Sequence, residues 1–224
     1  MQLEGRLLVV WLTRKLYYED MYMREFEATV VKVDGSRVIL DQTCFYPEGG
    51  GQVGDTGWIG EYRVVDTQLE GDEVVHYLEK PAPLKPGDRV KCRIDWDRRY
   101  RIMRLHSAAH IMEYFLHKVF GPLERVGSRV DERKDRSDYA YEGRLDPVKL
   151  KEVEELCNKF IAEGHEIRVE TPPDRPGFRV WRCAGIEMPC GGMHVKNTRE
   201  IGRIRLKRRN PGRGVERVET YLVD

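Results

Sequence analysis

The sequence lacks a hydrophobic run long enough to cross a membrane. Its most apolar stretch, LLVVWL at residues 7–12, is far shorter than the about 20 residues that a membrane-spanning helix needs. The polar TRKLYYED that follows contains no small-residue site of the kind at which signal peptides are cleaved. We therefore expect a cytoplasmic protein without a membrane partner, in which residues 7–12 form an apolar strand or an extension.

The sequence also lacks an excess of charge of either sign. It has 39 Lys+Arg and 38 Asp+Glu, and the resulting net charge of +1 means that any contact with nucleic acid must come from a local patch. The 5 cysteines are odd in number and widely scattered, which argues against a disulfide scaffold and favours a reducing cytosol. We find no internal repeat and no low-complexity tract, and nothing calls for an obligate protein partner.

The first part of the chain has the pattern of a small β-domain. Over residues 25–95, short β-rich runs recur, with hairpin signals at Asp34-Gly35 and around Gly71-Asp72. Several short strands at this spacing are typical of a small barrel. The period changes near Asp95, so we predict a β-rich, barrel-like domain over residues 1–95 that carries the glycine-rich loop described below.

The second part mixes helices and strands. Apolar residues recur at helical spacing over 97–120, where Gly121-Pro122 follows. A second helix is predicted over 146–162, because Asp146 suits the N-cap and Gly164 lies just past the end. We predict an α+β domain over residues 96–224. Its remaining elements are strands around 137–145, 165–171 and 178–183, and a last hairpin that turns at Asn210-Pro211-Gly212.

Two pairs of potential metal ligands each stand four residues apart. The stretch RLHSAAH places His106 and His110 on one face of the first helix, and PCGGMH places Cys190 and His194 on a glycine-rich turn. Three imidazoles and one thiolate suit tetrahedral Zn²⁺. We therefore predict one zinc ion per chain, bound by these four residues. The remaining histidines have no second potential metal ligand four residues away, so they are expected to be surface or hydrogen-bonded core residues. They are His76, His117 and His165.

The sequence contains no HExxH motif. A zinc peptidase or amidase is disfavoured, because the glutamate that would act as general base is missing between the two histidines. Structural zinc sites are usually cysteine-rich and tie small loops together. One thiolate and three imidazoles on a long helix and a glycine turn do not fit that description.

A second unusual stretch is DQTCFYPEGGGQVGDTG at residues 41–57. Three successive glycines allow a ligand to approach the backbone closely and leave amide N–H groups free to donate. Gln52 adds both a donor and an acceptor at the end of this run. A binding loop explains these features better than the simpler alternative, a long hairpin turn.

The strand RIRLKRR carries the most regular basic pattern of the chain. Its cations alternate with Ile204 and Leu206, so they lie on one face of a strand and are suited to phosphate contacts. A solvated strand face is the alternative. The predicted RNA-binding residues are Arg203, Arg205 and Lys207. A second basic patch is expected beside the metal-binding helix, formed by Arg98, Arg99, Arg101 and Arg104.

Three stretches together carry a family resemblance. TCFYPEGGGQVGDTG, RLHSAAH and CGGMHVKNTREIG, in this order, resemble the signatures of the alanyl-tRNA synthetase editing domain. From about Thr13 to the C-terminus, the chain is similar to the freestanding alanyl-tRNA editing proteins, the AlaX type, in their medium-length form. The first dozen residues lie upstream of the usual start of that family.

The resemblance implies a fold and an activity. It implies a β-barrel-like N-terminal domain followed by an α+β editing domain with a zinc site, and hydrolysis of Ser-tRNA(Ala) or Gly-tRNA(Ala). The family's zinc motif falls on the four residues named above. Its glycine-rich motif falls on Gly49, Gly50, Gly51 and Gln52, which are the candidate substrate-binding residues, and Gln52 is also the candidate catalytic residue.

The chain departs from the family at two positions. Many members carry threonine just before the second histidine of each metal pair, where this chain has Ala109 and Met193. Neither side chain has a polar hydrogen to donate to a serine hydroxyl. Thr43, just ahead of the glycine loop, is therefore our candidate for reading that hydroxyl.

The leading hypothesis is a zinc-dependent deacylase that acts in trans on tRNA(Ala) mischarged with serine or glycine. An alanine-specific pocket rejects an added hydroxyl only about 10²-fold, whereas a second site that hydrogen-bonds the hydroxyl selects for it. Zinc could activate a water molecule, or it could hold the substrate amino group. The alternative from another class is a non-catalytic, zinc-stabilised RNA-binding module.

Overall fold

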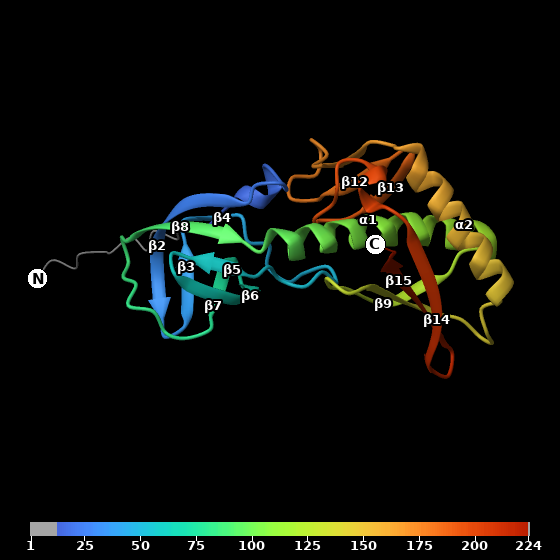
Figure 1. Cartoon of the computed structure of the whole chain (residues 1–224), viewed down its shortest axis with the longest axis horizontal. Helices are drawn as coiled ribbons and strands as arrows, with labels where there is room; N and C mark the ends of the chain where they lie inside the picture. The colour runs from blue at the N-terminus through green and yellow to red at the C-terminus, as the bar shows by residue number, and fades with distance from the viewer. Residues whose placement is uncertain (1–12, 224) are drawn as a thin grey trace, which may run out of the picture. The chain divides into compact units, whose positions relative to one another are not determined.

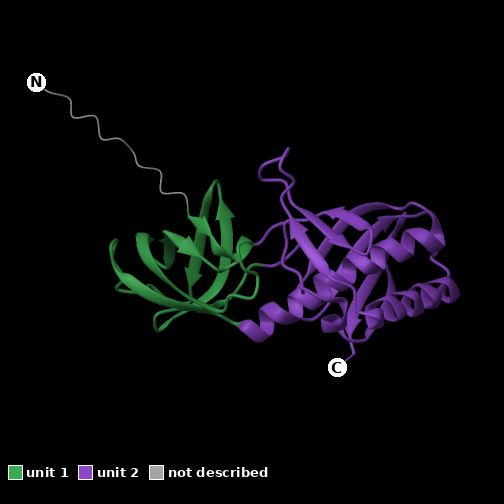
Figure 2. Cartoon of the chain, turned by 90° about the horizontal axis from the view of Figure 1, so that it is seen from above, with its two compact units in different colours: residues 1–47, 54–95 green, residues 48–53, 96–224 purple. Residues whose placement is uncertain are grey.

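The computed structural model describes residues 13–223, so LLVVWL at 7–12 lies outside the described residues. The chain forms two compact units, shown in different colours in Figure 2. Unit 1 is described from Thr13 to Pro47 and over 54–95, and unit 2 comprises 48–53 and the chain from Trp96 onward. None of the helices described over 13–223 is long and apolar enough to cross a membrane. The predicted mixture of helices and sheets is confirmed.

Unit 1 is built from short strands. Six of them pair into a closed barrel in the order β2-β3-β7-β6-β5-β8. In β2 and β8, buried and exposed residues alternate, which is the pattern of strands with one face on a core. The elements are β1 (Arg14–Lys15), η1 (Leu16–Tyr18), β2 (Glu25–Asp34), β3 (Arg37–Leu40), β4 (Gln42–Thr43), β5 (Gly57–Ile59), β6 (Tyr62–Glu70), β7 (Glu73–Leu78) and β8 (Arg89–Ile94).

Unit 2 packs two helices with two antiparallel sheets (Figure 1). The larger sheet has the order β14-β15-β10-β9, and the smaller has the order β11-β12-β13. Helix α1 contacts β9, β10 and β15, whereas α2 packs on β14. The elements are α1 (Trp96–Phe120), β9 (Glu124–Val130), β10 (Asp135–Ala140), α2 (Pro147–Glu163), β11 (Ile167–Glu170), β12 (Val180–Cys183), β13 (Ile186–Pro189), η2 (Thr198–Ile201), β14 (Ile204–Gly212) and β15 (Val215–Leu222).

The ends of α2 follow from local sequence signals. The Asp146 side chain caps the helix by accepting from the backbone N–H groups of Val148 and Lys149. Pro147 occupies the first turn, and Gly164 ends the helix in the left-handed conformation with φ +84°. The N-cap and C-terminal residues predicted for this helix are confirmed.

The glycine-rich loop belongs to unit 2, which corrects its predicted place in a 1–95 domain. The change of unit does fall between Asp95 and Trp96, where the period changes. However, residues 48–53 pair with the end of β9. Val130 N–H donates to Gly51 O at 2.7 Å, and Val53 N–H donates to Val130 O at 3.2 Å. These backbone hydrogen bonds join segments far apart in the sequence, so hydrophobic periodicity does not reveal them.

The last hairpin turns later than predicted. Arg213-Gly214 form the turn, with Gly214 at φ +75°, and Gly212 still pairs with Val215. Pro211 does not end the strand, because β14 is an edge strand with an irregular register after Arg209. An edge strand with a bulge tolerates the missing N–H of proline.

Candidate metal centre

Four potential ligands from two segments of unit 2 meet at one point. α1 supplies His106 and His110, and the turn after β13 supplies Cys190 and His194. One ligand atom from each of the four lies within 4.8 Å of every other. The predicted grouping of these four side chains is therefore present, and the site has the donor set of three nitrogens and one sulfur that zinc accepts.

Gln52 orients the ring of His106. Its Oε1 accepts the backbone N–H of Met193 at 2.9 Å, so this atom is the amide oxygen and a hydrogen-bond acceptor. His106 Nδ1 lies 2.8 Å from the same oxygen and must therefore donate to it. The lone pair then resides on His106 Nε2, which points toward the Cys190 sulfur 3.5 Å away. The glycine loop thus fixes the tautomer that can bind a metal.

Ser107 orients His194 in the same way, a role that was not predicted from the sequence. Its hydroxyl donates to Met103 O at 2.8 Å and accepts the Val195 N–H at 3.2 Å. The hydroxyl hydrogen is therefore already used, so His194 Nδ1, 3.2 Å away, donates to the oxygen. Nε2 of His194 is left with its lone pair toward Cys190 Sγ at 3.2 Å. A serine that bonds back to the previous helical turn is the signal that could have revealed this role.

His110 has a buried ring nitrogen that is available to bind a ligand. Its Nδ1 lies 3.1 Å from Met188 Sδ, and its ring stacks on Trp181 with centroids 5.0 Å apart. Its Nε2 is buried and has no hydrogen-bond partner among residues 13–223. A buried nitrogen without a partner is costly in a folded protein unless a ligand completes it. A metal ion would complete it.

Burial keeps the centre uncharged in the absence of a cation. It lowers the pKa of His106 to about 4, and it lowers the pKa values of His110 and His194 well below the ordinary value. It also raises the pKa of the Cys190 thiol to about 11. The imidazoles are therefore neutral at pH 7 and ready to coordinate, whereas the thiol would exchange its proton for the metal.

The glycines close to the centre are required by space. A Cβ on Gly192 would lie 2.2 Å from His106 Cε1, and one on Gly51, which has φ +84°, would lie 2.6 Å from Ser128 Oγ. Gly49 and Gln52 close the loop with two backbone hydrogen bonds of 3.0 Å. The Gln52 amide nitrogen is buried and has no partner within the described part of the chain. The loop therefore places an unused N–H donor beside the ligands.

Thr43 has a different environment from the one we expected. It lies in unit 1 and is fully buried. Its hydroxyl accepts the Phe45 N–H at 3.0 Å and lies 2.8 Å from His76 Nε2. His76 Nδ1 is 3.0 Å from the carbonyl oxygen of Val38 and donates to it, so Nε2 is the acceptor for the Thr43 hydroxyl. The hydroxyl hydrogen of Thr43 is thus already used inside unit 1, and His76 is a satisfied core residue as expected.

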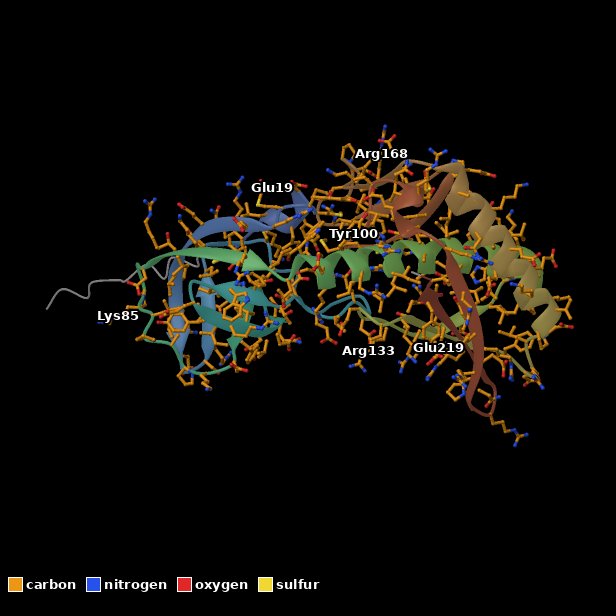
Figure 3. All side chains as sticks on the ribbon, in the orientation of Figure 1. Glu19, Lys85, Tyr100, Arg133, Arg168 and Glu219 are labelled. Atoms are coloured by element: carbon orange, nitrogen blue, oxygen red, sulfur yellow. The ribbon has the colours of Figure 1, made fainter. Side chains whose placement is uncertain are left out.

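The predicted RNA-binding strand has the expected alternation. In β14, Ile204 and Leu206 are buried, whereas Arg205 and Lys207 are exposed, and Arg203 just before the strand is exposed as well. The Lys207 ammonium lies 4.8 Å from the centre of the Tyr221 ring. The side chains of this face of the sheet, which includes Glu219, are drawn in Figure 3.

The second basic patch is largely committed to internal contacts. Arg99 is fully buried, and Arg104 donates to the backbone oxygen of Ile201 at 2.9 and 3.0 Å. Arg98 and Arg101 bond to the Glu132 carboxylate and backbone oxygen, respectively. The second basic patch stays a prediction, and these contacts show that its arginines also hold neighbouring elements in place.

Two known families match parts of the chain. Residues 13–98 match the family described as tRNA synthetases class II (A). Residues 179–219 match the threonyl and alanyl tRNA synthetase second additional domain. The second match includes Cys190, His194 and the whole of the basic strand β14.

Several proteins are similar over almost the whole chain. The alanyl-tRNA editing protein AlaX-M of Pyrococcus horikoshii is 41% identical over 216 residues, which cover 94% of this chain and 98% of that protein. The alanine–tRNA ligases of Metallosphaera sedula and Pyrococcus abyssi are 37% and 38% identical and cover 87% and 92% of this chain. The matched regions are 24% and 25% of those two ligases, so the chain corresponds to one part of them.

Proposed function

This chain belongs to the alanyl-tRNA editing protein family, and from that membership we propose that it hydrolyses the aminoacyl ester of Ser-tRNA(Ala), with Gly-tRNA(Ala) as a second substrate. The relationship itself supports editing of mischarged tRNA(Ala) in trans. The observation that supports a hydrolytic centre is the convergence of four oriented metal donors beside an unused amide N–H. Because aminoacyl-tRNA is used in translation, the cytoplasmic location expected from the sequence is part of this proposal.

We propose zinc as the bound metal, one ion per chain. The residues that would hold it are His106, His110, Cys190 and His194. A thiolate together with imidazoles favours zinc over magnesium or calcium, which prefer oxygen ligands. When bound, zinc would supply Lewis-acid chemistry at the ester.

Gln52 has two roles in this proposal. Its amide oxygen holds His106 and the backbone of Met193, as described above. Its amide nitrogen has no partner among the described residues and is available to donate to the ester carbonyl oxygen, on which negative charge develops during hydrolysis. The close approach that the neighbouring glycines allow suits the terminal ribose of a tRNA, which must reach this amide.

The tRNA itself would be held through its phosphates. Arg205 and Lys207 are exposed on one face of β14, where a cation can meet a phosphate of the RNA backbone. Such contacts do not depend on which amino acid is esterified. The basic strand would therefore contribute affinity, and the metal centre would contribute selectivity.

The function is tested by incubating the purified protein with Ser-, Gly- and Ala-tRNA(Ala) and following the loss of each ester. We expect the serine ester to disappear fastest and the alanine ester to survive. If no ester is hydrolysed selectively while tRNA still binds, the alternative is favoured, namely a zinc-stabilised RNA-binding module without catalytic activity.

A further inference from the structure

The sheet face under α1 carries polar residues where a hydrophobic core would be expected. Along β10, Asp135, Ser137 and Tyr139 are buried, while the residues between them are partly exposed. Their strand alternates, so all three side chains lie on the same face. α1 packs on this face, as its contacts with β9, β10 and β15 show (Figure 1). We call these three residues the polar floor.

The polar floor is incompletely satisfied by the protein. Ser137 Oγ donates to Asp135 Oδ2 at 3.2 Å. Among residues 13–223, the buried hydroxyl of Thr220, the direct cross-strand neighbour of Asp135, has no hydrogen-bond partner, and the buried hydroxyl of Tyr139 has only a weak interaction with Ser137 that falls short of a well-formed hydrogen bond. Two such hydroxyls next to a buried carboxyl are unusual in a native core, because each costs free energy. A polar ligand that hydrogen-bonds to these hydroxyls would explain why they are buried.

The polar floor adjoins the metal centre through the sheet. Gln52, whose side chain holds His106, forms a bridge with Val130, and Val130 pairs directly with Asp135. Adjacent strands are about 4.8 Å apart, so the backbones of Gln52 and Asp135 are separated by two such steps, or about 10 Å. This span is within the reach of two side chains and a small amino acid between them.

An ion pair links the helix that carries the metal ligands to the strand next to the polar floor. Glu113 lies one helical turn after His110 and forms an ion pair of 2.9 Å with Arg125, which is the cross-strand neighbour of Tyr139. Arg125 therefore stands between α1, one turn past a metal ligand, and β10, beside Tyr139.

We propose that the polar floor receives the side-chain hydroxyl of the seryl ester, with Asp135 as its acceptor and Tyr139 as its donor. This inference rests on the proposed function. A seryl side chain would pair the carboxyl and the phenol, whereas the methyl group of an alanyl ester would leave both incompletely bonded. A site built to hydrogen-bond a hydroxyl rejects the analogue that lacks it far better than an apolar pocket rejects an added hydroxyl. The polar floor thus replaces Thr43, whose hydroxyl hydrogen is used elsewhere.

Tyr139→Phe is the sharpest test, because the hydroxyl it removes has no well-formed hydrogen bond among residues 13–223. A purely structural role predicts unchanged or improved folding and unchanged substrate preference. The proposed role predicts that hydrolysis of Ser-tRNA(Ala) falls about 10-fold to 100-fold relative to Ala-tRNA(Ala), the range expected for the removal of one hydrogen bond. Zinc content should not change.

Asp135→Asn, which keeps the shape but removes the charge, is the second variant. Its matched control is Asp138→Asn on the same strand, whose side chain lies on the opposite face and is held by Arg217 at 2.6 Å. We expect Asp135→Asn to reduce the preference for the serine ester and Asp138→Asn to leave it unchanged. If Asp135→Asn does not fold, Tyr139→Phe decides the question alone.

Binding of unreactive analogues separates this inference from the proposed function. Seryl and alanyl amides of 3′-amino-3′-deoxyadenosine can be compared by calorimetry with wild type and with Tyr139→Phe. Tighter binding of the seryl amide that disappears in the variant supports the polar floor, even if wild type hydrolyses no ester. Selective hydrolysis by wild type with the same preference in Tyr139→Phe and Asp135→Asn overturns the polar floor and leaves the proposed function standing.

Discussion

Unit 1 and unit 2 each bury histidine, and the comparison shows how a structural histidine differs from a candidate ligand. His76 in unit 1 and His106 in unit 2 are both buried, and burial lowers the pKa of each to about 4. Both donate through Nδ1 to an oxygen of the protein. The difference lies in Nε2, which accepts the Thr43 hydroxyl in His76 and faces Cys190 and two further histidines in His106.

A structural histidine therefore cannot be told from a candidate ligand by its burial or its pKa, but it can be told by the partner of its second ring nitrogen.

The same contrast holds for buried carboxyls. Asp55 in unit 1 accepts the backbone N–H of Tyr46 at 2.7 Å. Asp135 in unit 2 has a serine hydroxyl at 3.2 Å and lies beside incompletely bonded hydroxyls. In both comparisons, the residue of unit 1 uses its hydrogen-bonding capacity within the protein, whereas the residue of unit 2 keeps capacity to bind a ligand.

The largest effect is expected from removing the thiolate. Cys190→Ala should lose most of its zinc and lower the hydrolysis of Ser-tRNA(Ala) about 10³-fold, since metal catalysis is worth several kcal/mol. Elemental analysis and single-turnover kinetics measure the two losses. Cys183→Ala, which removes a buried thiol from the neighbouring strand β12, should keep the metal. Full zinc occupancy in Cys190→Ala would remove Cys190 from the ligand set.

The buried carboxyl should make the protein less stable as pH rises. Burial raises the pKa of Asp135 from its ordinary 3.8 to about 7, so the folded state binds the proton more tightly than the unfolded state. Its cost to stability is absent below about pH 4, grows as the pH rises toward 7 and is constant above. At about 1.4 kcal/mol per pKa unit, the cost reaches at most about 4 kcal/mol.

Asp135→Asn should therefore be more stable than wild type at pH 8, with a smaller difference at pH 6. Urea unfolding of the zinc-bound proteins at both pH values measures this, and Asp138→Asn serves as the control for the charge change. A difference that does not grow with pH would show that the Asp135 carboxyl is solvated or paired, contrary to the structure.

Two substitutions of Gln52 distinguish its oxygen from its nitrogen. Gln52→Ala should weaken metal binding about 10-fold to 100-fold, because it releases the ring of His106. Gln52→Glu retains an acceptor for His106 and lacks the amide hydrogens. It should keep its zinc and hydrolyse the serine ester about 10²-fold more slowly. Equal zinc affinity in both variants and wild type would mean that Gln52 does not orient the ligand.

Thr43→Val tests the hydrogen bond between Thr43 and His76 in unit 1. The variant leaves His76 Nε2 buried without a donor and should destabilise unit 1 by about 1–3 kcal/mol. Zinc content and the preference for serine over alanine should stay as in wild type, because the Thr43 hydroxyl serves His76. Thermal unfolding and deacylation assays test these expectations. A loss of serine preference at unchanged stability would restore Thr43 as the residue that reads the hydroxyl.

The smallest effect is expected on the exposed strand β14. Replacing Arg205 and Lys207 with alanine should weaken tRNA binding and lower the slope of affinity against salt concentration by about one for each phosphate that the variant no longer binds. Binding titrations at several salt concentrations measure the slope. Hydrolysis of a short aminoacyl-adenosine should not change, and an unchanged salt slope would exclude this strand as an RNA surface.

The sequence allowed prediction of those features that depend on local spacing. The pairs His106–His110 and Cys190–His194 are each four residues apart, and the caps of α2 lie at its predicted ends. The alternation of β14 is also local. Each of these signals lies within a few residues, so a single sequence reveals it.

The remaining features depend on partners that are distant in sequence. The glycine loop joins unit 2 through Val130, about 80 residues along the chain, as its backbone hydrogen bonds show. The alternating polar residues of DRSDYA are typical of a solvated strand, yet Asp135, Ser137 and Tyr139 face the interior. Only the cover provided by α1 decides which face of this strand is buried. No periodicity rule could assign it.

The central claim is that the four converging donors hold the metal on which serine-ester hydrolysis depends. It is tested most directly by removing the metal from the wild-type protein, returning zinc in steps, and measuring bound zinc and the hydrolysis of Ser- and Ala-tRNA(Ala) on the same samples. We predict that hydrolysis of the serine ester rises in proportion to zinc and stops rising at one ion per chain, while the alanine ester remains intact. Full serine-ester hydrolysis by the metal-free protein would contradict the account.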